Sequence, residues 1–256
     1  MFDAVLFDLD ETLIHDEAVG RHAFVVTAYE LTQDETRAQQ LGMAAFQHAL
    51  ALWKTMAPIA IEYGQRIGHS AVEGLWADYD ASIPAEAQLQ QEMARIRPEI
   101  WRLALKDCGL SGDAEKLEAR WRALRHAYPL YSDTDAVLAT LRPKTKLGIV
   151  TNGVQGLQRK KLNGSGLLHW FDAVAVSGEV RIGKPDPGIF QWVADQLGVD
   201  VKRCVMVGDN PDRDVLGGKN AGMKTAWVDR GHATRHISAD VVGKSLSELL
   251  PFLLGG

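Results

Sequence analysis

Short apolar runs alternate with amphipathic stretches along the second half of the chain, from about Leu130 onward. A short apolar run is typical of a buried strand, and a longer amphipathic stretch is typical of a surface helix. The apolar runs are Leu147–Val150, Asp172–Val176, Cys204–Val207 and Thr225–Val228, and the amphipathic stretches between them include Pro187–Leu197 and Pro211–Ala221. Strands and helices in alternation predict βαβ units, and therefore a Rossmann-like α/β fold whose parallel sheet is covered by helices on both faces.

A different pattern fills the region between about His15 and Pro129, which contains no convincing strand. Apolar residues recur there at helical spacing, and we expect these stripes to pack helix against helix. We also expect Pro84 and Pro98 to break or kink helices. The recurring sets are Met43, Phe46, Leu50 and Trp53; Met93, Ile96, Ile100 and Leu103; and Leu117, Trp121, Leu124 and Tyr128.

The opening strand, Ala4–Phe7, is predicted to belong to the same sheet as the later strands. The helical region is therefore an insertion that interrupts the α/β domain directly after its first strand. We predict two domains, a core of residues 1–14 and 130–256 and an all-helical insert of residues 15–129. Four tryptophans of the insert are expected to pack in its core rather than to stack on a nucleobase. They are Trp53, Trp76, Trp101 and Trp121.

Composition narrows the class of partner. The net charge of −5 at pH 7 argues against a nucleic acid polymer or an anionic membrane as the main partner. No apolar run approaches the ~20 residues that cross a bilayer. The two cysteines, Cys108 and Cys204, form no spaced motif, and the N-terminus shows no signal-peptide pattern. We therefore expect a cytoplasmic protein, monomeric or homodimeric, with a small-molecule partner.

Polar residues follow several of the predicted strands at the point where each strand ends. In an open parallel sheet, ligands bind beyond the carboxyl ends of the strands. We therefore expect these stretches to meet at one rim of the folded sheet, although they are far apart in the sequence. The polar stretches are Asp8–Thr12, Thr151–Gly153, Gly183–Pro185 and Gly208–Asn210, the last followed by Asp212 and Asp214.

Three carboxylates would crowd together at this rim, those of Asp8, Asp10 and Asp209. Like charges that lie this close either raise one another's pKa values or require a cation. Oxygen ligands suit a hard ion such as Mg²⁺, which proteins typically hold with one or two carboxylates and a substrate phosphate. The pattern therefore predicts a magnesium site.

Other polar groups at the rim suit a phosphate. Lys184 supplies positive charge to a phosphate or to the Asp8 carboxylate. The hydroxyl of Thr151 and the amide of Asn152 can bind phosphate oxygens, and backbone N–H groups at the following helix start would add further donors. The predicted ligands of the rim are therefore a divalent cation and a phosphoryl group together.

Four stretches, "DLDETL", "VTNG", "GKPDP" and "GDNPDRDV", resemble the four motifs of the haloacid dehalogenase superfamily, in the same order. The helical insert after the first motif resembles the type C1 cap of that superfamily. The "TNG" form, together with "KPDPGIF" and "GGKNAGM", is most similar to its subfamily I phosphatases. These include nucleotide 5′-phosphatases and sugar-phosphate phosphatases.

The resemblance implies a phosphatase mechanism. Asp8 would attack phosphorus and form an aspartyl-phosphate. Asp10 would protonate the leaving oxygen and then deprotonate the hydrolytic water. The implied metal ligands are Asp8, Asp10 and Asp209. The implied phosphate-binding residues are Thr151, Asn152 and Lys184. Asp214 would orient Lys184 or a metal-bound water.

Two other functions fit parts of the pattern. A 2-haloacid dehalogenase of the same superfamily also uses an aspartate nucleophile, but its chemistry needs no metal, so Asp10 and Asp209 argue against it. A non-catalytic phosphoacceptor domain also gathers acidic groups and a lysine on a parallel sheet, but it has no use for a long insert after the first strand.

We therefore predict a Mg²⁺-dependent phosphomonoester hydrolase that acts on a small phosphorylated metabolite, either a nucleoside monophosphate or a sugar phosphate. The insert is expected to close over the site as a lid that excludes bulk water and selects the leaving group. Its hinges are expected near Leu13–Glu17 and Tyr128–Asp133.

The remaining polar candidates are interpreted as structural. Glu11 and Asp212 are interpreted as charges favoured by the dipole at a helix N-terminus. Lys160 and Lys161 are interpreted as part of a solvated helix face. Cys204 is interpreted as a buried residue. His232 and His236 are interpreted as loop residues, because no third metal ligand accompanies them.

Overall fold

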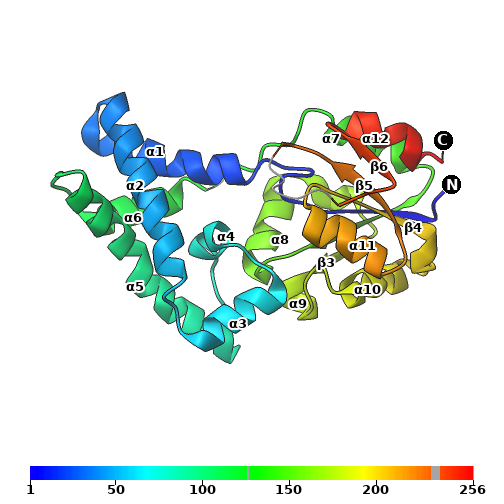
Figure 1. Cartoon of the computed structure of the whole chain (residues 1–256), viewed down its shortest axis with the longest axis horizontal. Coiled ribbons are helices and arrows are strands. Elements are labelled where there is room, and N and C mark those ends of the chain that lie inside the picture. Colours follow the sequence, from blue (N-terminus) through cyan, green and yellow to red (C-terminus); the bar gives the residue numbers. More distant parts are fainter. Residues whose placement is uncertain (126, 232–236, 256) are drawn as a thin grey trace. The chain divides into compact units, whose positions relative to one another are not determined.

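The computed structural model describes residues 1–125, 127–231 and 237–255. Within these residues, six strands form one parallel sheet in the order β3-β2-β1-β4-β5-β6 (Figure 1). The prediction of an α/β fold is confirmed, and β6 is a strand that the sequence pattern did not indicate. The strands are β1 (Ala4–Phe7), β2 (Lys146–Thr151), β3 (Ala173–Val176), β4 (Cys204–Gly208), β5 (Lys224–Val228) and β6 (Val241–Gly243).

Strand β1 lies in the middle of the sheet, between β2 and β4, and all four of its residues are fully buried. Its side chains alternate between the two faces, as the twofold period of a strand requires. Val5 and Phe7 belong to the hydrophobic core on one face, and Ala4 and Leu6 to the core on the other. This central, doubly buried position explains why β1 is a continuous apolar run.

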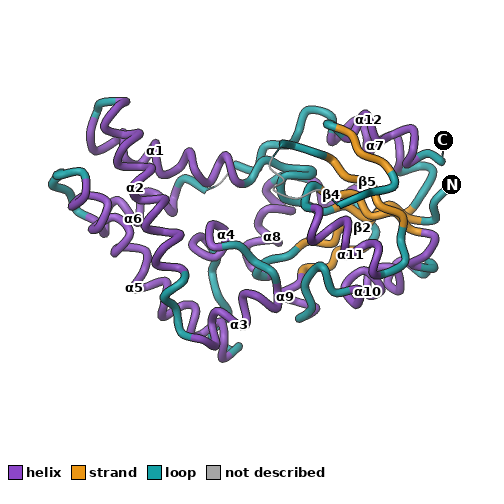
Figure 2. The backbone as a smooth tube through the Cα atoms, viewed as in Figure 1, coloured by secondary structure: helices purple, strands orange, loops and turns teal. Residues whose placement is uncertain are grey.

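Helices cover both faces of the sheet (Figure 2). Residues of α7 and α12 join the core on the face of Val5, and residues of α10 join the core on the face of Leu6. The helical elements around the sheet are α7 (Thr134–Leu141), α8 (Gln155–Gly164), η1 (Leu167–Trp170), α9 (Ser177–Val180), α10 (Pro187–Leu197), η2 (Val201–Arg203), η3 (Pro211–Val215), α11 (Leu216–Asn220) and α12 (Leu246–Leu253).

The chain divides into two compact units. The sheet unit comprises Met1–His15, Arg66–Gly68 and Tyr128–Gly256, and the helical unit comprises Asp16–Gln65 and His69–Ala127. The short segment Arg66–Gly68 therefore belongs with the sheet although it lies within the helical stretch of the sequence. The predicted domain boundaries, and the predicted role of residues 15–129 as a lid, stay predictions.

The helical unit packs around a cluster of aromatic rings. Phe24 is 1% exposed, and its ring centroid lies 4.7 Å from that of Trp121 and 5.8 Å from that of Trp101. Trp76 joins the same cluster, which confirms the expected core packing for these three tryptophans, and Trp53 is half-buried. The helices from this part of the chain are α1 (Glu17–Thr32), α2 (Glu35–Trp53), α3 (Pro58–Ile67), α4 (Ala71–Trp76), α5 (Pro84–Asp107) and α6 (Ala114–Ala123).

The two prolines of α5 behave differently. Pro84 is the first residue of the helix, where its missing N–H costs no hydrogen bond. From the sequence, Pro98 is expected to break or kink a helix; it lies inside α5, so the expected break is wrong. Ile96 and Ile100, two positions before and two positions after it, are fully buried, and this packing holds the helical path across the proline.

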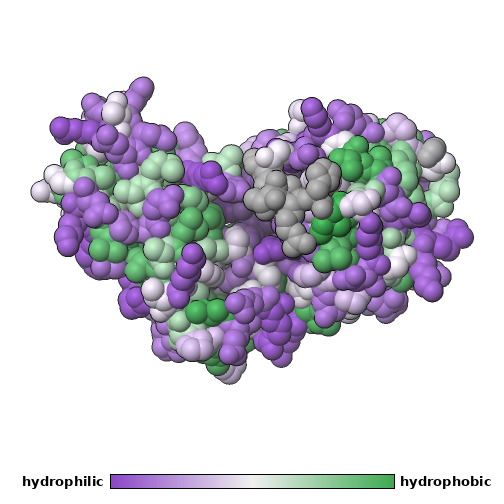
Figure 3. Space-filling model, viewed as in Figure 1, coloured by the Kyte–Doolittle hydropathy of each residue, from purple (hydrophilic) through white to green (hydrophobic). Residues whose placement is uncertain are grey.

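Polar residues cover most of the face shown in Figure 3, and hydrophobic patches are scattered among them on each unit. Large exposed hydrophobic side chains include Trp192 at 37% and Val242 at 47%. No helix among the described residues is both long enough and apolar enough to cross a membrane.

Candidate active site

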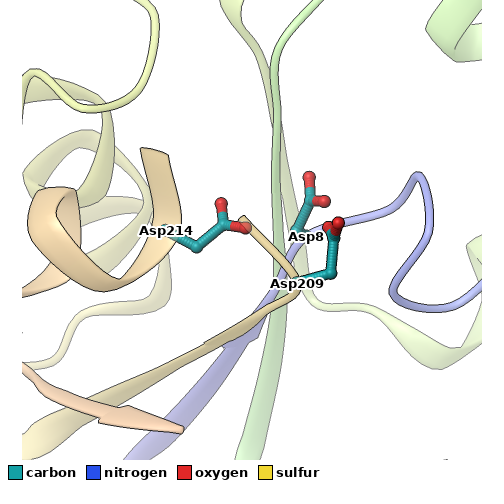
Figure 4. Close-up of side chains that lie close together, drawn as sticks. All are labelled: Asp8, Asp209 and Asp214. Atoms are coloured by element: carbon teal, nitrogen blue, oxygen red, sulfur yellow. The ribbon is translucent and has the colours of Figure 1, made fainter. Parts of the chain in front are cut away.

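Three carboxylates meet beyond the carboxyl ends of the central strands (Figure 4). Asp8 directly follows β1, Asp209 directly follows β4, and Asp214 lies in η3. One carboxylate oxygen from each of the three residues lies within 4.8 Å of the other two. The Asp8 N–H donates to the carbonyl oxygen of Val207 at 2.9 Å, so the pairing of β1 with β4 sets the distance between these loops.

Lys184 is the cation of this cluster. Its Nζ lies 2.5 Å from Oδ1 of Asp8 and 2.7 Å from Oδ1 of Asp214. Burial alone would lower the pKa of Lys184, but the carboxylates of Asp214 and Asp8 outweigh it and raise that pKa above its ordinary value. The lysine therefore stays charged inside the protein, and it touches the predicted nucleophile.

The negative charge of the cluster exceeds its positive charge. Burial raises the pKa of Asp209 well above its usual range, and the carboxylates of Asp8 and Asp214 raise it further. Burial also raises the pKa of Asp214, to about 6, against the opposing effect of Lys184. One ammonium cannot neutralise three carboxylates, so the remaining repulsion between them favours binding of a further cation. The donor set consists of carboxylate oxygens, so the residues present fit Mg²⁺.

Two buried residues position Asp209. The Asp209 N–H donates to Oγ1 of Thr12 at 3.1 Å, and that hydroxyl lies 3.3 Å from Oδ1 of Asp209 and 3.4 Å from Oδ2 of Asp8. The indole N–H of Trp227 donates to the Asp209 carbonyl oxygen at 2.9 Å. Neither residue was singled out from the sequence, although Thr12 belongs to the "DLDETL" stretch.

The loops after β2 and β3 are tied to each other by Asn152. Its Oδ1 accepts a hydrogen bond from the Lys184 N–H at 2.8 Å, and its Nδ2 donates to the Lys184 carbonyl oxygen at 2.9 Å. Thr151 is fully buried, and the Gly153 N–H donates to Oγ of Ser177 at 2.9 Å. The predicted phosphate-binding residues thus lie on connected loops, with the Asn152 side chain engaged by the backbone of Lys184.

Asp10 lies on a separate part of the site. It is not among the three carboxylates that meet within 4.8 Å. Its two oxygens lie 2.8 and 2.9 Å from Nζ of Lys161, and Nε2 of Gln158 donates to Oδ2 at 2.9 Å. Lys161 is fully buried, so its interpretation as part of a solvated helix face is wrong, whereas Lys160 is exposed. The signal that could have revealed this arrangement is the spacing of Gln158 and Lys161, which places both on one face of α8.

The remaining candidates have different outcomes. Glu11 lies in a turn with φ of 56°, six residues before α1 begins, and its Oε2 accepts a hydrogen bond from the Tyr131 hydroxyl at 2.7 Å. Its interpretation as a helix charge is therefore wrong. Asp212 does lie in the first turn of η3, and Cys204 is fully buried. His232 and His236 lie outside the described residues.

Comparison with known proteins identifies the class. Residues 2–222 match the haloacid dehalogenase-like hydrolases, and the chain belongs to this family. The phosphoserine phosphatase of Thermus thermophilus is 39% identical over 234 residues, which cover 89% of this chain and 88% of that protein. The pyrimidine 5′-nucleotidase YjjG of Escherichia coli is 35% identical over 161 residues, which cover 62% and 67%. The chain is thus an enzyme of a hydrolase family, and these curated relatives are phosphatases.

A solved structure shows the same fold. The L-2-haloacid dehalogenase of Xanthobacter autotrophicus, with chloropropionic acid covalently bound, superposes with a TM-score of 0.62. The match covers 100% of this chain and 99% of that one, at 22% identity. An identity this low establishes the shared fold alone, and it leaves the reaction to be argued from the site.

Proposed function

We propose that this protein is a Mg²⁺-dependent phosphomonoester hydrolase that acts on a small phosphorylated metabolite through an aspartyl-phosphate on Asp8. The observation that carries the proposal is the buried cluster in which Lys184 contacts Asp8 and Asp214, with Asp209 beside them. A dianionic phosphoryl group needs positive charge around it, and the lysine together with a divalent cation would supply that charge.

The proposed reaction has two steps. A carboxylate oxygen of Asp8 attacks phosphorus, the bond from phosphorus to the ester oxygen breaks, and that oxygen takes a proton from Asp10 and leaves as an alcohol. Asp10 then removes a proton from a water whose oxygen attacks the phosphorus of the aspartyl-phosphate. The bond between phosphorus and Asp8 breaks, inorganic phosphate leaves, and both carboxyl groups return to their starting states.

We assign the metal to Asp8, Asp10 and Asp209, as the family resemblance implies. The Asp10 carboxylate is held by Lys161, so the contribution of Asp10 would come from its backbone carbonyl oxygen. When bound, the ion would neutralise charge on the nucleophile and on the phosphoryl oxygens. Asp214 would keep the Lys184 ammonium aimed at the phosphoryl group, which their 2.7 Å contact supports.

Thr151, Asn152 and Lys184 are the proposed phosphate-binding residues. Thr151 would offer its hydroxyl and Lys184 its ammonium. The Asn152 amide makes two hydrogen bonds to the backbone of Lys184, so its main proposed effect is to keep these two loops together around the phosphate. Residues 15–129 are proposed to act as the cap that selects the leaving group, because they are inserted shortly after Asp8, which follows the first strand.

The candidate substrates are phosphoserine, nucleoside monophosphates and sugar phosphates. Phosphoserine enters because the relative that matches 89% of this chain is named a phosphoserine phosphatase. Nucleoside monophosphates are supported by the nucleotidase of Escherichia coli. Sugar phosphates are supported by three mammalian N-acylneuraminate-9-phosphatases, which are 35–40% identical to parts of this chain.

Hydrolysis of p-nitrophenyl phosphate with Mg²⁺ and with chelator tests the proposal. We expect turnover that requires the metal, loss of turnover in Asp8→Asn, and retained turnover in Asp212→Asn, which removes a carboxylate elsewhere in the η3 loop. A panel of phosphoserine, nucleoside monophosphates and sugar phosphates then defines the substrate. Equal turnover in chelator, or halide release from 2-chloropropionate without phosphatase activity, would contradict the proposal.

A further inference from the structure

The side-chain amide of Gln158 connects two residues of the proposed site. Its Nε2 lies 2.9 Å from Oδ2 of Asp10 and 2.6 Å from Oγ1 of Thr151. An amide nitrogen carries two hydrogens, so both hydrogen bonds can form at the same time. Gln158 is fully buried, and one amide therefore links the proposed acid/base residue to a proposed phosphate-binding residue without competition from water.

The contact with Gln158 also determines what the Thr151 hydroxyl can do. Because the Thr151 oxygen accepts a hydrogen bond from the amide, its own hydrogen is available to donate elsewhere. A phosphate oxygen is a strong acceptor for that hydrogen. The amide thus favours the rotamer of Thr151 in which the hydroxyl acts as a donor to substrate.

Lys161 also contacts the Asp10 carboxylate and fixes its position. Its ammonium contacts both carboxylate oxygens, at 2.8 and 2.9 Å, from a side chain with no exposed surface. Gln158 and Lys161 are three residues apart on α8, so they project from the same face of that helix. With two oxygens fixed by one ammonium and one of them also by an amide, the Asp10 carboxylate has a single orientation.

Two further features concern the position of the Gln158 side chain: the space that Gly153 leaves for it, and a buried oxygen atom without a hydrogen bond. Gly153 has φ of 144°, and a Cβ added there would lie 2.9 Å from Cγ and Cδ of Gln158, so a larger residue would displace the side chain. The other end of the amide, Oε1, is buried and accepts no hydrogen bond from any residue that the structure describes. A buried acceptor without a donor destabilises a fold, and such groups cluster where function requires them.

We infer that Gln158 is a positioning residue that couples phosphate binding by Thr151 to proton transfer by Asp10. Gln158 and Lys161 together hold the Asp10 carboxylate, and we call this pair the clamp. This inference rests on the proposed phosphatase function. Without the clamp, the Asp10 carboxylate would rotate away from the leaving oxygen, and the Thr151 hydroxyl would no longer be directed at phosphate. A misplacement of about 1 Å can cost on the order of 100-fold in rate.

The test compares two leaving groups in Gln158→Met. The first is p-nitrophenyl phosphate, whose leaving group departs with little need for a proton. The second is the alkyl phosphate that the wild-type enzyme hydrolyses fastest in the panel, whose leaving oxygen must be protonated. We expect kcat/KM to fall about 100-fold for the alkyl ester and at most about tenfold for the aryl ester, with a higher KM for both because Thr151 is loosened.

Lys161→Met separates the two halves of the clamp. Lys161 contacts both carboxylate oxygens of Asp10, so this variant should show the same preference for the aryl ester. Its KM should be unchanged, because the hydrogen bond from Gln158 to Thr151 is left in place. It also carries the test if Gln158→Met is unfolded at the assay temperature. The matched controls are Gln155→Met and Lys160→Met, which make the same changes at exposed positions of α8 and should match wild type.

Different results would overturn the proposed function and the proposed role of Gln158. If the wild-type enzyme hydrolyses neither ester, the proposed function itself fails. If wild type hydrolyses both, and Gln158→Met and Lys161→Met slow both esters by the same factor, the clamp has only a structural role and the inference is overturned. An alkyl-specific loss in both variants supports it.

Discussion

Nζ of Lys184 lies 2.7 Å from Oδ1 of Asp214, and the two side chains are 2% and 1% exposed. A charge pair buried this deeply is strongly destabilised when one partner is removed, because the other charge is left without a counterion in a medium of low dielectric constant. The proposed phosphate-binding lysine is therefore also a structural residue of the sheet unit.

Lys184→Met should both abolish activity and destabilise the protein. It leaves the buried carboxylates of Asp8 and Asp214 without their ammonium, and we expect a loss of about 3–5 kcal/mol in the free energy of unfolding at neutral pH. Urea denaturation of the chelated protein measures the loss. The control is Lys202→Met, which removes an exposed lysine and should change the free energy by less than about 0.5 kcal/mol.

The double variant Lys184→Met/Asp214→Asn separates the electrostatic cause from simple loss of packing. Removing one of the stranded carboxylates should restore part of the stability and none of the activity. If the double variant were as unstable as the sum of the two single variants, the two residues would be energetically independent and the pairing argument would fail.

Asp209→Asn should stabilise the metal-free protein while removing its response to Mg²⁺. Burial raises the pKa of Asp209, and the carboxylates of Asp8 and Asp214 raise it further, so the site disfavours the ionised form when no cation is bound. Without that charge, the melting temperature in chelator should rise. Wild type should gain stability on adding Mg²⁺, by about 2.7 kcal/mol at 100 times its Kd, and the variant should gain little.

Asp212→Asn serves as the control for this experiment, since it removes a carboxylate of η3 that is not among the three that meet. It should keep the wild-type difference between melting temperatures in Mg²⁺ and in chelator. An equal magnesium response in Asp209→Asn and wild type would remove Asp209 from the metal site.

The acid stability of the sheet should depend on Asp172, which precedes β3. Burial alone would raise the pKa of Asp172, but hydrogen bonds from Arg142 at 2.6 Å and from the Leu147 N–H at 3.0 Å lower it below its ordinary value. A carboxylate with a lowered pKa stabilises the fold above its unfolded-state pKa of about 3.9, and this contribution is lost as the pH falls through the lower folded value.

Unfolding free energies measured between about pH 5 and about pH 2.5 test whether stability falls with pH as Asp172 becomes protonated. Asp172→Asn should be less stable than wild type at the upper end of the range and should show a shallower decline with falling pH. Arg142→Met should flatten the decline as well, because it removes the charged partner. A decline as steep as that of wild type in both variants would contradict the assignment.

The sequence predicts the sheet and the rim of acidic loops because both follow from local patterns. Each buried strand is a short apolar run, and the carboxyl ends of parallel strands share one edge, so Asp8 and Asp209 are expected at the same rim. The core packing of Trp121 follows equally from helical spacing. β6 is short and half-exposed, and it carries no comparable apolar run.

What the sequence does not predict is which charged residues are buried by a distant partner. Lys161 has the same local pattern as Lys160, but it forms a buried ion pair with Asp10, which is 151 residues away in the chain. The role of Glu11 was likewise not predictable from local sequence, because its hydrogen-bond partner Tyr131 is 120 residues away. At Pro98, tertiary packing of the flanking isoleucines outweighs a local helix-breaking preference.

Phe24→Ala tests whether the aromatic cluster of the helical unit is a structural core. Phe24 packs against Trp121 and Trp101 with almost no exposed surface, so truncating it should cost about 3–5 kcal/mol in the free energy of unfolding of that unit. Tyr29→Ala, at a position of the same helix that is 43% exposed, should cost far less. Tryptophan fluorescence during urea denaturation follows the change directly, because the indoles themselves report on the cluster. A Phe24→Ala variant with wild-type stability and a raised KM for nucleoside monophosphates alone would instead show that these rings bind a base.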